Sequence, residues 1–154
     1  MGRPSDQKPE GNHVVPLVSI GLPVYNGEDY LAGAIDAILK QSFEDFELII
    51  SDNASTDSTW DICQQFAAAD QRISLLRNDT NLGAAENYNR LFHAAKGKYF
   101  KWAAADDLCA PEFLERCVEV LESDDMVVLC YPESEFIDEN GERTDDVAVD
   151  PDLR

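Results

Sequence analysis

The chain has 154 residues, which is room for one domain with a single hydrophobic core. It holds 31 Asp and Glu against 12 Lys and Arg, a formal net charge of −19 at pH 7. Such a charge repels phosphate backbones and anionic lipid headgroups, and no apolar run approaches the ~18 residues needed to cross a bilayer. The sequence therefore excludes nucleic-acid binding by charge and a transmembrane segment within these residues.

Residues 1–15 contain prolines, glycines and scattered charges without periodicity, and are predicted to form a disordered leader. They lack the basic and apolar stretches of a secretion signal. The four cysteines form no C-x-x-C pair and no metal-ligand spacing, which favours reduced thiols in a cytoplasmic protein. The ordered domain is expected to span residues 16–154.

From Leu17 onward, short apolar runs alternate with stretches of helical periodicity. Strands are predicted at residues 17–22, 46–50, 73–76, 99–102 and 126–130. Helices are predicted between them. Their apolar faces are Tyr30, Leu31, Ala34, Ile35, Ile38 and Leu39 in the first, Ile62, Cys63, Phe66 and Ala67 in the second, Tyr88, Leu91, Phe92 and Ala95 in the third, and Phe113, Leu114, Cys117, Val118 and Leu121 in the fourth. This alternation predicts an α/β fold, a mostly parallel sheet with helices on both faces.

Three local signals add detail to this pattern. Ser58 and Asp61 have the spacing of a capping box at the start of the second helix. Gly97 suits the C-cap of the third helix. Asn140 and Gly141 suggest a small hairpin with an Asn-Gly turn near the end of the chain.

Polar, turn-forming residues follow four of the predicted strands. They are residues 23–28, 51–57 and 78–83 and the pair Asp106-Asp107. Ligands of open α/β sheets bind at the carboxyl ends of the strands, so these loops are expected to converge on one site. Adjacent aspartates suit Mg²⁺ or Mn²⁺, the alternative for this pair being a helix N-terminal region. Asp52, just past a buried strand, is placed to accept a hydrogen bond from a base or a ribose.

The motifs at these positions, in this order, resemble glycosyltransferase family 2. They are V-S-I-x-x-P-V-Y-N from Val18, S-D-N-A-S-T-D-S-T from Ser51, N-L-G from Asn81, and the Asp-Asp pair. The family has the GT-A fold, a Rossmann-like α/β arrangement, and transfers sugars from nucleotide sugars with inversion. The resemblance covers Leu17 to about Tyr131 and implies that residues 16–154 are the nucleotide-sugar-binding half of a longer GT-A domain.

The resemblance also implies a set of site residues. Nucleotide-sugar binding falls to Pro23, Val24, Tyr25, Asn26, Glu28, Asp52, Asn81 and Asp106. Asp52 would bind the base edge, commonly uracil, and Asp106 and Asp107 would hold the Mg²⁺ or Mn²⁺ ion that bridges the diphosphate. The catalytic residue is unassigned, because the family's general base comes from a second half, expected beyond Arg154.

The chain departs from the family pattern in three places. The acidic motif reads Ala104-Ala-Asp-Asp, where the family often has Asp-Ala-Asp-Asp. Tyr88 stands where the family often has Arg, with Arg90 as a candidate substitute two places on. The residues after the acidic pair hold no second run of strands and helices. Their acids, such as Asp138 and Asp145, are interpreted as solvated turn residues rather than as the base.

Two functions are therefore predicted. One is an inverting glycosyltransferase that moves a sugar from a nucleotide diphosphate sugar, expected to be a UDP-sugar, to a hydroxyl of an unidentified saccharide or lipid-linked acceptor. The other is a nucleotide- and metal-binding module without independent turnover. Relatives build polysaccharide or glycolipid near a membrane, so a cytoplasmic location, at the inner membrane face through other regions, is expected. A dinucleotide oxidoreductase is disfavoured, because no G-x-G-x-x-G follows the first strand.

Overall fold

The computed structural model describes residues 15–138 and 141–144. The chain divides into two compact units, Met1–Glu112 and Phe113–Arg154, which are treated separately below. The predicted leader lies outside the described residues except for Val15, which is exposed.

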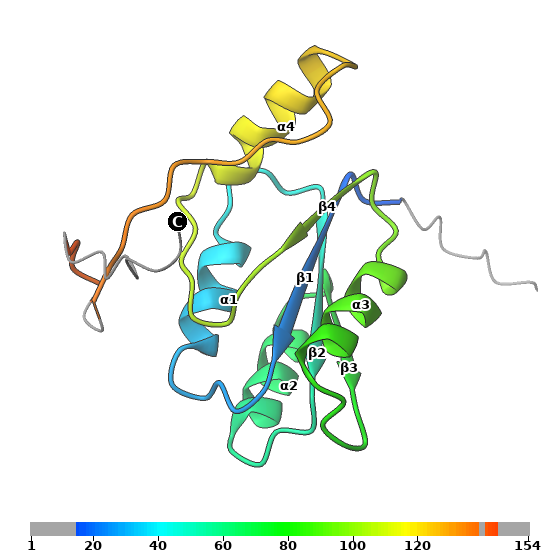
Figure 1. Ribbon diagram of the computed structural model, residues 1–154, viewed down its shortest axis with the longest axis vertical. Coiled ribbons are helices and arrows are strands. Elements are labelled where there is room, and N and C mark those ends of the chain that lie inside the picture. Colours follow the sequence, from blue (N-terminus) through cyan, green and yellow to red (C-terminus); the bar gives the residue numbers. More distant parts are fainter. Residues whose placement is uncertain (1–14, 139–140, 145–154) are drawn as a thin grey trace, which may run out of the picture. The chain divides into compact units, whose positions relative to one another are not determined.

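The first unit alternates strands and helices along the chain. The order is β1 (Val18–Val24), α1 (Leu31–Leu39), β2 (Phe46–Asp52), α2 (Thr59–Ala69), β3 (Ile73–Arg77), α3 (Ala84–Ala94) and β4 (Tyr99–Trp102). All strand pairs are parallel, and the sheet order is β3-β2-β1-β4. In Figure 1, α3 covers one face of this sheet, while α1 and α2 pack together on the other. The predicted α/β class, with a parallel sheet and helices on both faces, is confirmed.

The helices are short and amphipathic. α1 has nine residues, and α2, α3 and α4 (Phe113–Ser123) have eleven each. α1 follows most of its predicted pattern: it buries Leu31, Ala34, Ile35 and Ile38, but Tyr30 precedes the helix and is exposed. α3 departs from its pattern, because it buries Asn87 with Leu91 and leaves Tyr88 and Phe92 exposed. No helix in the described part of the chain is both long and apolar enough to cross a bilayer.

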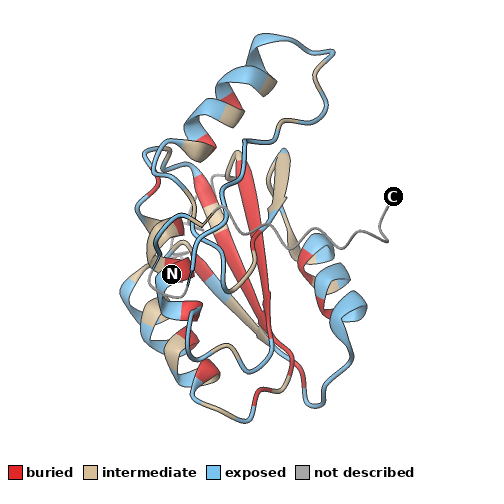
Figure 2. Cartoon of the chain, turned by 60° about the vertical axis from the view of Figure 1, so that its left-hand side comes forward, coloured by how far each residue is buried: buried red, intermediate tan, exposed pale blue. Residues whose placement is uncertain are grey.

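The two faces of the sheet differ in chemistry. A Cβ added at Gly21 would lie 2.9 Å from Leu91 Cβ on α3, so position 21 faces α3. Because strand side chains alternate, the neighbouring positions face α1 and α2. Those positions are large, apolar and buried: Val18, Ile20, Leu22, Phe46, Leu48 and Ile50. Figure 2 shows burial concentrated on the strands and on one side of each helix of this unit. The hydrophobic core therefore lies mainly between the sheet and the α1–α2 layer.

The face toward α3 carries small and polar residues on β1, where Ser19 and Gly21 lie, beside larger apolar residues such as Ile49 and Phe100. Ser19 Oγ donates a hydrogen bond to Glu47 Oε1 at 2.7 Å and accepts the amide of Gly97 at 2.8 Å. A Cβ added at Gly97 would lie 2.6 Å from Ser19 N, so only glycine fits this approach of backbone to backbone. The predicted C-cap role of Gly97 is wrong: the C-cap of α3 is Ala95, in extended conformation, and Gly97 has no positive φ.

The predicted fifth strand is wrong. Residues 126–130 of the second unit form no strand, and Met126 and Val128 are 84% and 90% exposed. A strand forms when a neighbour pairs with its backbone N–H and C=O groups, and no described segment pairs with this one. Apolar, β-branched composition alone therefore overpredicted a strand here.

The hairpin predicted near the end of the chain is supported by the described residues on both sides of its turn. Ile137 and Arg143 form an isolated antiparallel bridge. Gly141 has φ +79° and donates its amide to the Asp138 carbonyl at 2.9 Å. Asn140, the other predicted turn residue, lies outside the described residues, as does Asp145.

Replacement of Gly97 by Ala is expected to destabilise the protein by about 1–3 kcal/mol, because the new methyl group must displace the β1 backbone. The matched control is Gly33→Ala on α1, where an added Cβ meets only Leu108 Cδ2 at 3.9 Å. There Ala should stabilise the helix by about 0.5–1 kcal/mol. Urea unfolding followed by circular dichroism measures both, and equal stability of the two variants would refute the close-approach argument.

Candidate functional site

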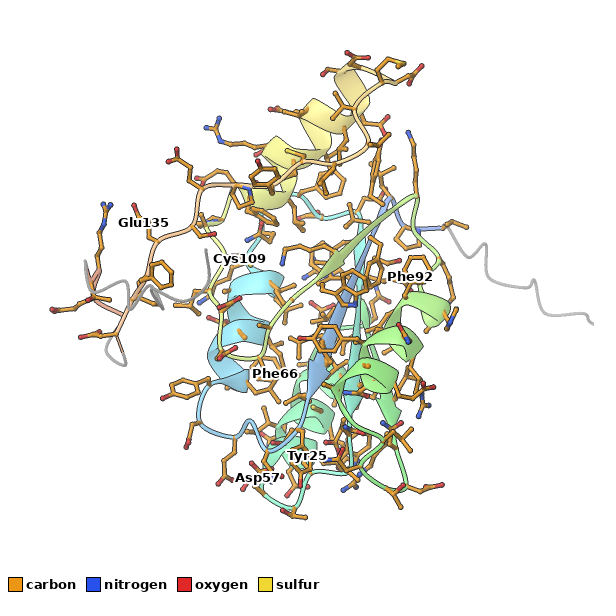
Figure 3. All side chains as sticks on the ribbon, viewed as in Figure 1. Tyr25, Asp57, Phe66, Phe92, Cys109 and Glu135 are labelled. Atoms are coloured by element: carbon orange, nitrogen blue, oxygen red, sulfur yellow. The ribbon has the colours of Figure 1, made fainter. Side chains whose placement is uncertain are left out.

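The carboxyl ends of β1, β2 and β3 meet at one edge of the sheet. The strand register pairs Val24 with Asp52 and Asp52 with Arg77, so the three strands end side by side. The loops that follow them therefore share this edge, and Figure 3 shows Tyr25 and Asp57 together there. The structure thus brings together three of the loops that the sequence places in one site.

The loop after β1 is hydrogen-bonded to the loop after β2. The amide of Asn26 donates to Ser55 Oγ at 2.9 Å, and Asn26 Oδ1 accepts the amide of Thr56 at 2.9 Å. Both loops hold a residue in the left-handed region, Asn26 at φ +50° and Ala54 at φ +62°. A non-glycine residue stays in this region only where its surroundings enforce it. Asn26, a predicted nucleotide ligand, therefore has its side-chain oxygen occupied within the protein.

The same two loops close over the N-terminus of α2. The amide of Ser58 donates to Glu28 Oε2 at 2.9 Å, and the amide of Thr59 donates to Asp57 Oδ1 at 3.0 Å. The Ser58 side chain makes no capping hydrogen bond, so the predicted Ser58–Asp61 capping box is wrong. Two carboxylates instead satisfy the free N–H groups at the positive end of the helix.

Hydrogen bonding sets the charge state of Asp57. Burial alone would raise the pKa of its carboxyl group, but hydrogen bonds from Thr59 and from the Glu28 amide outweigh burial and lower it below 3.8. Asp57 is therefore ionised at neutral pH, as its role at the start of α2 requires.

Asp52 is fully buried at the end of β2. Its Oδ1 accepts the amide of Ser55 at 3.0 Å. Its Oδ2 lies 3.1 Å from Arg77 Nε but makes no aligned hydrogen bond. Arg77 is itself stacked over the ring of Trp60. Burial, followed by the charge of Asp52, raises the pKa of the neighbouring Cys63 thiol to about 12, which keeps that thiol protonated and unreactive.

A pocket of about 310 Å³ opens at this edge, on the α3 side. Its lining consists of Pro23, Val24, Tyr25, Asn53, Asn81, Gly83, Ala84, Asn87 and Tyr88. Pro23, Val24, Tyr25 and Asn81 were predicted as nucleotide ligands, whereas Asn26, Glu28 and Asp52 are not part of the lining. All the described lining residues are uncharged, with two tyrosines and three asparagines among them.

The pocket floor is held by a buried cluster of polar side chains, Ser51, Asn53, Asn78 and Asn87, here called the amide cluster. Asn53 Nδ2 donates to Asn81 Oδ1 at 2.9 Å, and Asn78 Nδ2 donates to Asn53 Oδ1 at 2.8 Å. The cluster joins the ends of β2 and β3 to α3. Sequence reasoning placed Asn78 in a converging loop without a role of its own, and missed Asn87. The available signal for Asn87 was a polar residue one turn before Leu91, on the buried face of the predicted helix.

The acidic pair follows β4 in an exposed loop. Asp106 and Asp107 are both exposed, and a Cβ added at Gly27 would lie 3.7 Å from Ala105 Cβ, so this loop lies against the loop after β1. Among the residues that the structure describes, no three acidic, His or Cys side chains form a metal site by themselves. Two adjacent exposed carboxylates nevertheless fit Mg²⁺ or Mn²⁺, which usually takes one or two protein carboxylates with waters and phosphate oxygens.

Arg90, the candidate substitute for the family's arginine, points elsewhere. Its guanidinium donates to Asn78 Oδ1 in the amide cluster, and Arg90 is not part of the pocket lining. Tyr88, at the family's arginine position, does line the pocket. The pocket therefore has an aromatic ring at the position where the resemblance implies an arginine.

A larger hollow of about 700 Å³ lies at the opposite edge of the sheet, near the starts of β2 and β3. It is shallow and lined by the ends of α1 and α2 with Glu44, Asp70 and Arg72. Arg72 Nη2 lies 2.7 Å from Asp70 Oδ2, and this ion pair lowers the pKa of the Asp70 carboxyl group. These two charges at the hollow therefore pair with each other. The smaller pocket, at the edge where the polar loops meet, is the candidate site.

Comparison with known proteins agrees with this geometry. A protein-family model for glycosyl transferase family 2 matches residues 19–148. The chain belongs to glycosyl transferase family 2. The match begins at the second residue of β1 and takes in β2, β3, β4 and the Asp106-Asp107 pair.

Curated relatives support the same family. The chain is 34% identical over 128 residues to the uncharacterized glycosyltransferase MJ1057 of Methanocaldococcus jannaschii, covering 82% of this chain and 44% of the relative. It is 38% identical over 106 residues to TuaG of Bacillus subtilis, named for teichuronic acid biosynthesis, covering 69% and 42%. It is 32% identical over 113 residues to glycosyltransferase GlyG of Streptococcus pneumoniae, covering 73% and 38%. The chain thus spans less than half the length of these relatives.

Solved structures show the same fold. Residues 1–349 of Staphylococcus aureus TarS in complex with UDP match with a TM-score of 0.66 at 23% identity, covering 77% of this chain and 39% of TarS. The mannosyltransferase PcManGT of Pyrobaculum calidifontis, in complex with GDP-Man and Mn²⁺, matches with a TM-score of 0.64 at 26% identity, covering 77% and 36%. The predicted GT-A fold is confirmed.

Replacement of Asp57 by Ala is expected to lower stability at pH 7 by about 1 kcal/mol, the usual cost of losing a helix N-terminal cap. Because folding lowers the pKa of Asp57 below 3.8, its stabilisation is present above that pH and is lost as the pH falls below it. The stability difference between wild type and variant should therefore shrink in acid. Urea unfolding at pH 7, 5 and 3 measures it. Asp29→Ala, an exposed carboxylate in the preceding loop, should change stability by less than about 0.5 kcal/mol; an Asp57→Ala difference that does not change with pH would contradict the assignment.

Proposed function

We propose that this chain is the donor-binding part of an inverting glycosyltransferase that takes a nucleotide diphosphate sugar together with Mg²⁺ or Mn²⁺. The observation that carries the proposal is the uncharged pocket at the carboxyl edge of the sheet, with an acidic pair in a neighbouring loop of the same edge. A nucleotide sugar needs both features, a neutral slot for the base and a cation site for the diphosphate.

The composition of the pocket suits a nucleobase better than a phosphate. Tyr25 and Tyr88 offer aromatic surface, while Asn81 and Asn87 offer amide groups for hydrogen bonds. A diphosphate would need cations or a row of backbone N–H groups, and no charged side chain is present among the described lining residues. Among structural neighbours, TarS has been solved with UDP and with UDP-GlcNAc, and PcManGT with GDP-Man. We therefore assign the base of a UDP-sugar to this pocket.

The assigned donor residues fall into two groups. Pro23, Val24, Tyr25 and Asn81 line the pocket and would contact the nucleotide directly. Asn26 and Glu28 hydrogen-bond to the loop after β2 and would act by holding Tyr25 in place. Asp52 stays a predicted base contact, which would require its carboxylate to turn away from Arg77.

Asp106 and Asp107 would hold the metal ion. The bound ion would neutralise the charge that the nucleoside diphosphate gains as the bond to the sugar breaks. The carboxylates of Asp106 and Asp107 would be the protein groups that hold that ion beside the base pocket. The PcManGT complex contains Mn²⁺, which favours the same cofactor class here.

The acceptor and the general base are not assigned to residues of this chain. The name of TuaG favours a polysaccharide acceptor, and such assembly would take place on the cytoplasmic side of a membrane. Because the chain spans less than half of its relatives, the second candidate function is a donor-binding module that does not turn over alone.

Calorimetric titration of the chain with UDP, with and without Mn²⁺, tests the proposal. Binding is expected only or mainly with Mn²⁺, and Asp107→Ala should weaken it at least about tenfold, since even outer partners of metal ligands contribute that much. Asp45→Ala, an exposed carboxylate just before β2, is the matched control and should bind like wild type.

Three results would count against the proposal. Binding of UDP that is equally tight without metal would remove the assigned role of the acidic pair. An Asp107→Ala variant that binds like wild type would do the same. No binding of UDP, GDP or dTDP to a folded sample would refute the donor site itself, and hydrolysis or transfer assays with UDP-sugars would separate an enzyme from a binding module.

A further inference from the structure

Asn87 is a buried amide in the pocket lining whose hydrogen bonds are only partly used inside the protein. It lies on α3, is 2% exposed, and lines the pocket with Asn53 and Tyr88. Its Oδ1 accepts from Ser51 Oγ at 2.6 Å and from Asn78 Nδ2 at 3.1 Å, and its Nδ2 donates to the Ser51 carbonyl at 2.9 Å.

The orientation of this amide is fixed by a neighbour that can only donate. The Arg90 guanidinium has no acceptor, so the Asn78 atom that it contacts must be Oδ1. Asn78 Nδ2 must then face Asn53 and Asn87, which places an oxygen of each opposite it. Asn87 Nδ2 is thereby directed away from Asn78 and donates to the Ser51 carbonyl.

One hydrogen on Asn87 Nδ2 therefore has no acceptor among the described residues. An amide nitrogen carries two N–H groups, and a single acceptor, the Ser51 carbonyl, is present for it. Asn53, the other buried amide in the lining, differs: its Nδ2 donates to Asn81 Oδ1 and the Gly83 carbonyl, and its Oδ1 accepts from Leu82 N and Asn78 Nδ2. A buried N–H without an acceptor costs about 1–3 kcal/mol, which an acceptor on a ligand would offset.

We infer that Asn87 is a specificity-determining residue of the proposed nucleotide site, donating a hydrogen bond to the O4 carbonyl oxygen of uracil. This inference rests on the proposed function. In a pyrimidine nucleotide, C4 lies across the ring from N1, which carries the ribose. A base that enters the pocket with its ribose and diphosphate toward solvent and the acidic pair therefore presents its 4-position to the floor, where Asn87 is buried.

The inference predicts discrimination between uracil and cytosine. Cytosine has an amino group in place of O4, so its N–H would face the Asn87 N–H, and both donors would be left unpaired. The aromatic and apolar contacts of the pocket are the same for both bases. Asn87 would therefore favour UDP over CDP at the 4-position of the base.

Titration of the full chain with UDP and with CDP, each with Mn²⁺, tests this. Wild type should bind UDP about tenfold or more tightly than CDP, the effect of roughly 1.4 kcal/mol. Asn87→Ala should weaken UDP binding to near the CDP value and leave CDP binding almost unchanged. Asn87→Asp, which keeps the acceptor oxygen but replaces N–H by a second acceptor, should shift the preference toward CDP. His93→Ala, at an exposed position on the same helix, should retain the wild-type ratio.

The outcomes separate this inference from the proposed function. Wild type that binds neither nucleotide refutes both. Wild type that binds UDP and CDP equally, or Asn87→Ala that keeps the wild-type ratio while binding, overturns the role of Asn87 alone. If Asn87 had only a structural role, Asn87→Ala would lower the affinities for UDP and for CDP by the same factor. That result also overturns the assigned role of Asn87. If Asn87→Ala fails to fold, the ratios of UDP affinity to CDP affinity in wild type and in Asn87→Asp still test the role of Asn87.

Discussion

The close approach of α3 to the sheet is the constraint on which the candidate site depends. Gly21 and Gly97 leave no space for a side chain, and Ser19 and Ser51 are the small residues on either side. This allows Asn87 to reach the backbone of β2, at 2.9 Å from the Ser51 carbonyl. At Ser19, Gly21 and Ser51 this face gives up the apolar burial that larger residues would supply, a loss of ~1.5–3 kcal/mol per large side chain. What it gains is a rigid, hydrogen-bonded floor at the end of the sheet where ligands bind.

The fold could be predicted where one local pattern decides it. Residues 46–50 and 73–76 were found because buried strands are apolar, and α1 was found because its apolar residues follow the helical period. The prediction failed where the structure of a segment depends on a contact with a distant part of the chain. Residues 126–130 are as apolar as a strand, yet pairing depends on a neighbour that no local pattern specifies. Gly97 matched the local pattern of a helix C-cap. Its actual contact, Ser19 on β1, is distant in the sequence and could not be read from that pattern.

The same distinction holds in the site. Pro23, Tyr25 and Asn81 could be predicted to line a pocket because they follow strands, and parallel strand ends share an edge. The amide cluster could not, because its hydrogen bonds join residues as far as 36 positions apart, such as Ser51 and Asn87. Sequence shows that polar side chains exist but not which of them satisfy one another. The sequence likewise gave no sign that Asn26, a predicted ligand, shares a hydrogen bond with Thr56.

Charge explains why the proposed donor site would depend on a metal ion. The chain carries −19, and the two arginines at this edge are engaged, Arg77 with Asp52 and Arg90 with Asn78. Two like unit charges 4 Å apart repel by about 4 kcal/mol at an effective dielectric constant of 20, so a diphosphate placed beside Asp106 and Asp107 needs a cation between them. The resemblance implies an arginine at position 88 and an aspartate at position 104, and this chain has uncharged Tyr88 and Ala104 there. With no cation at position 88, the proposed metal ion would be the positive charge available to the diphosphate.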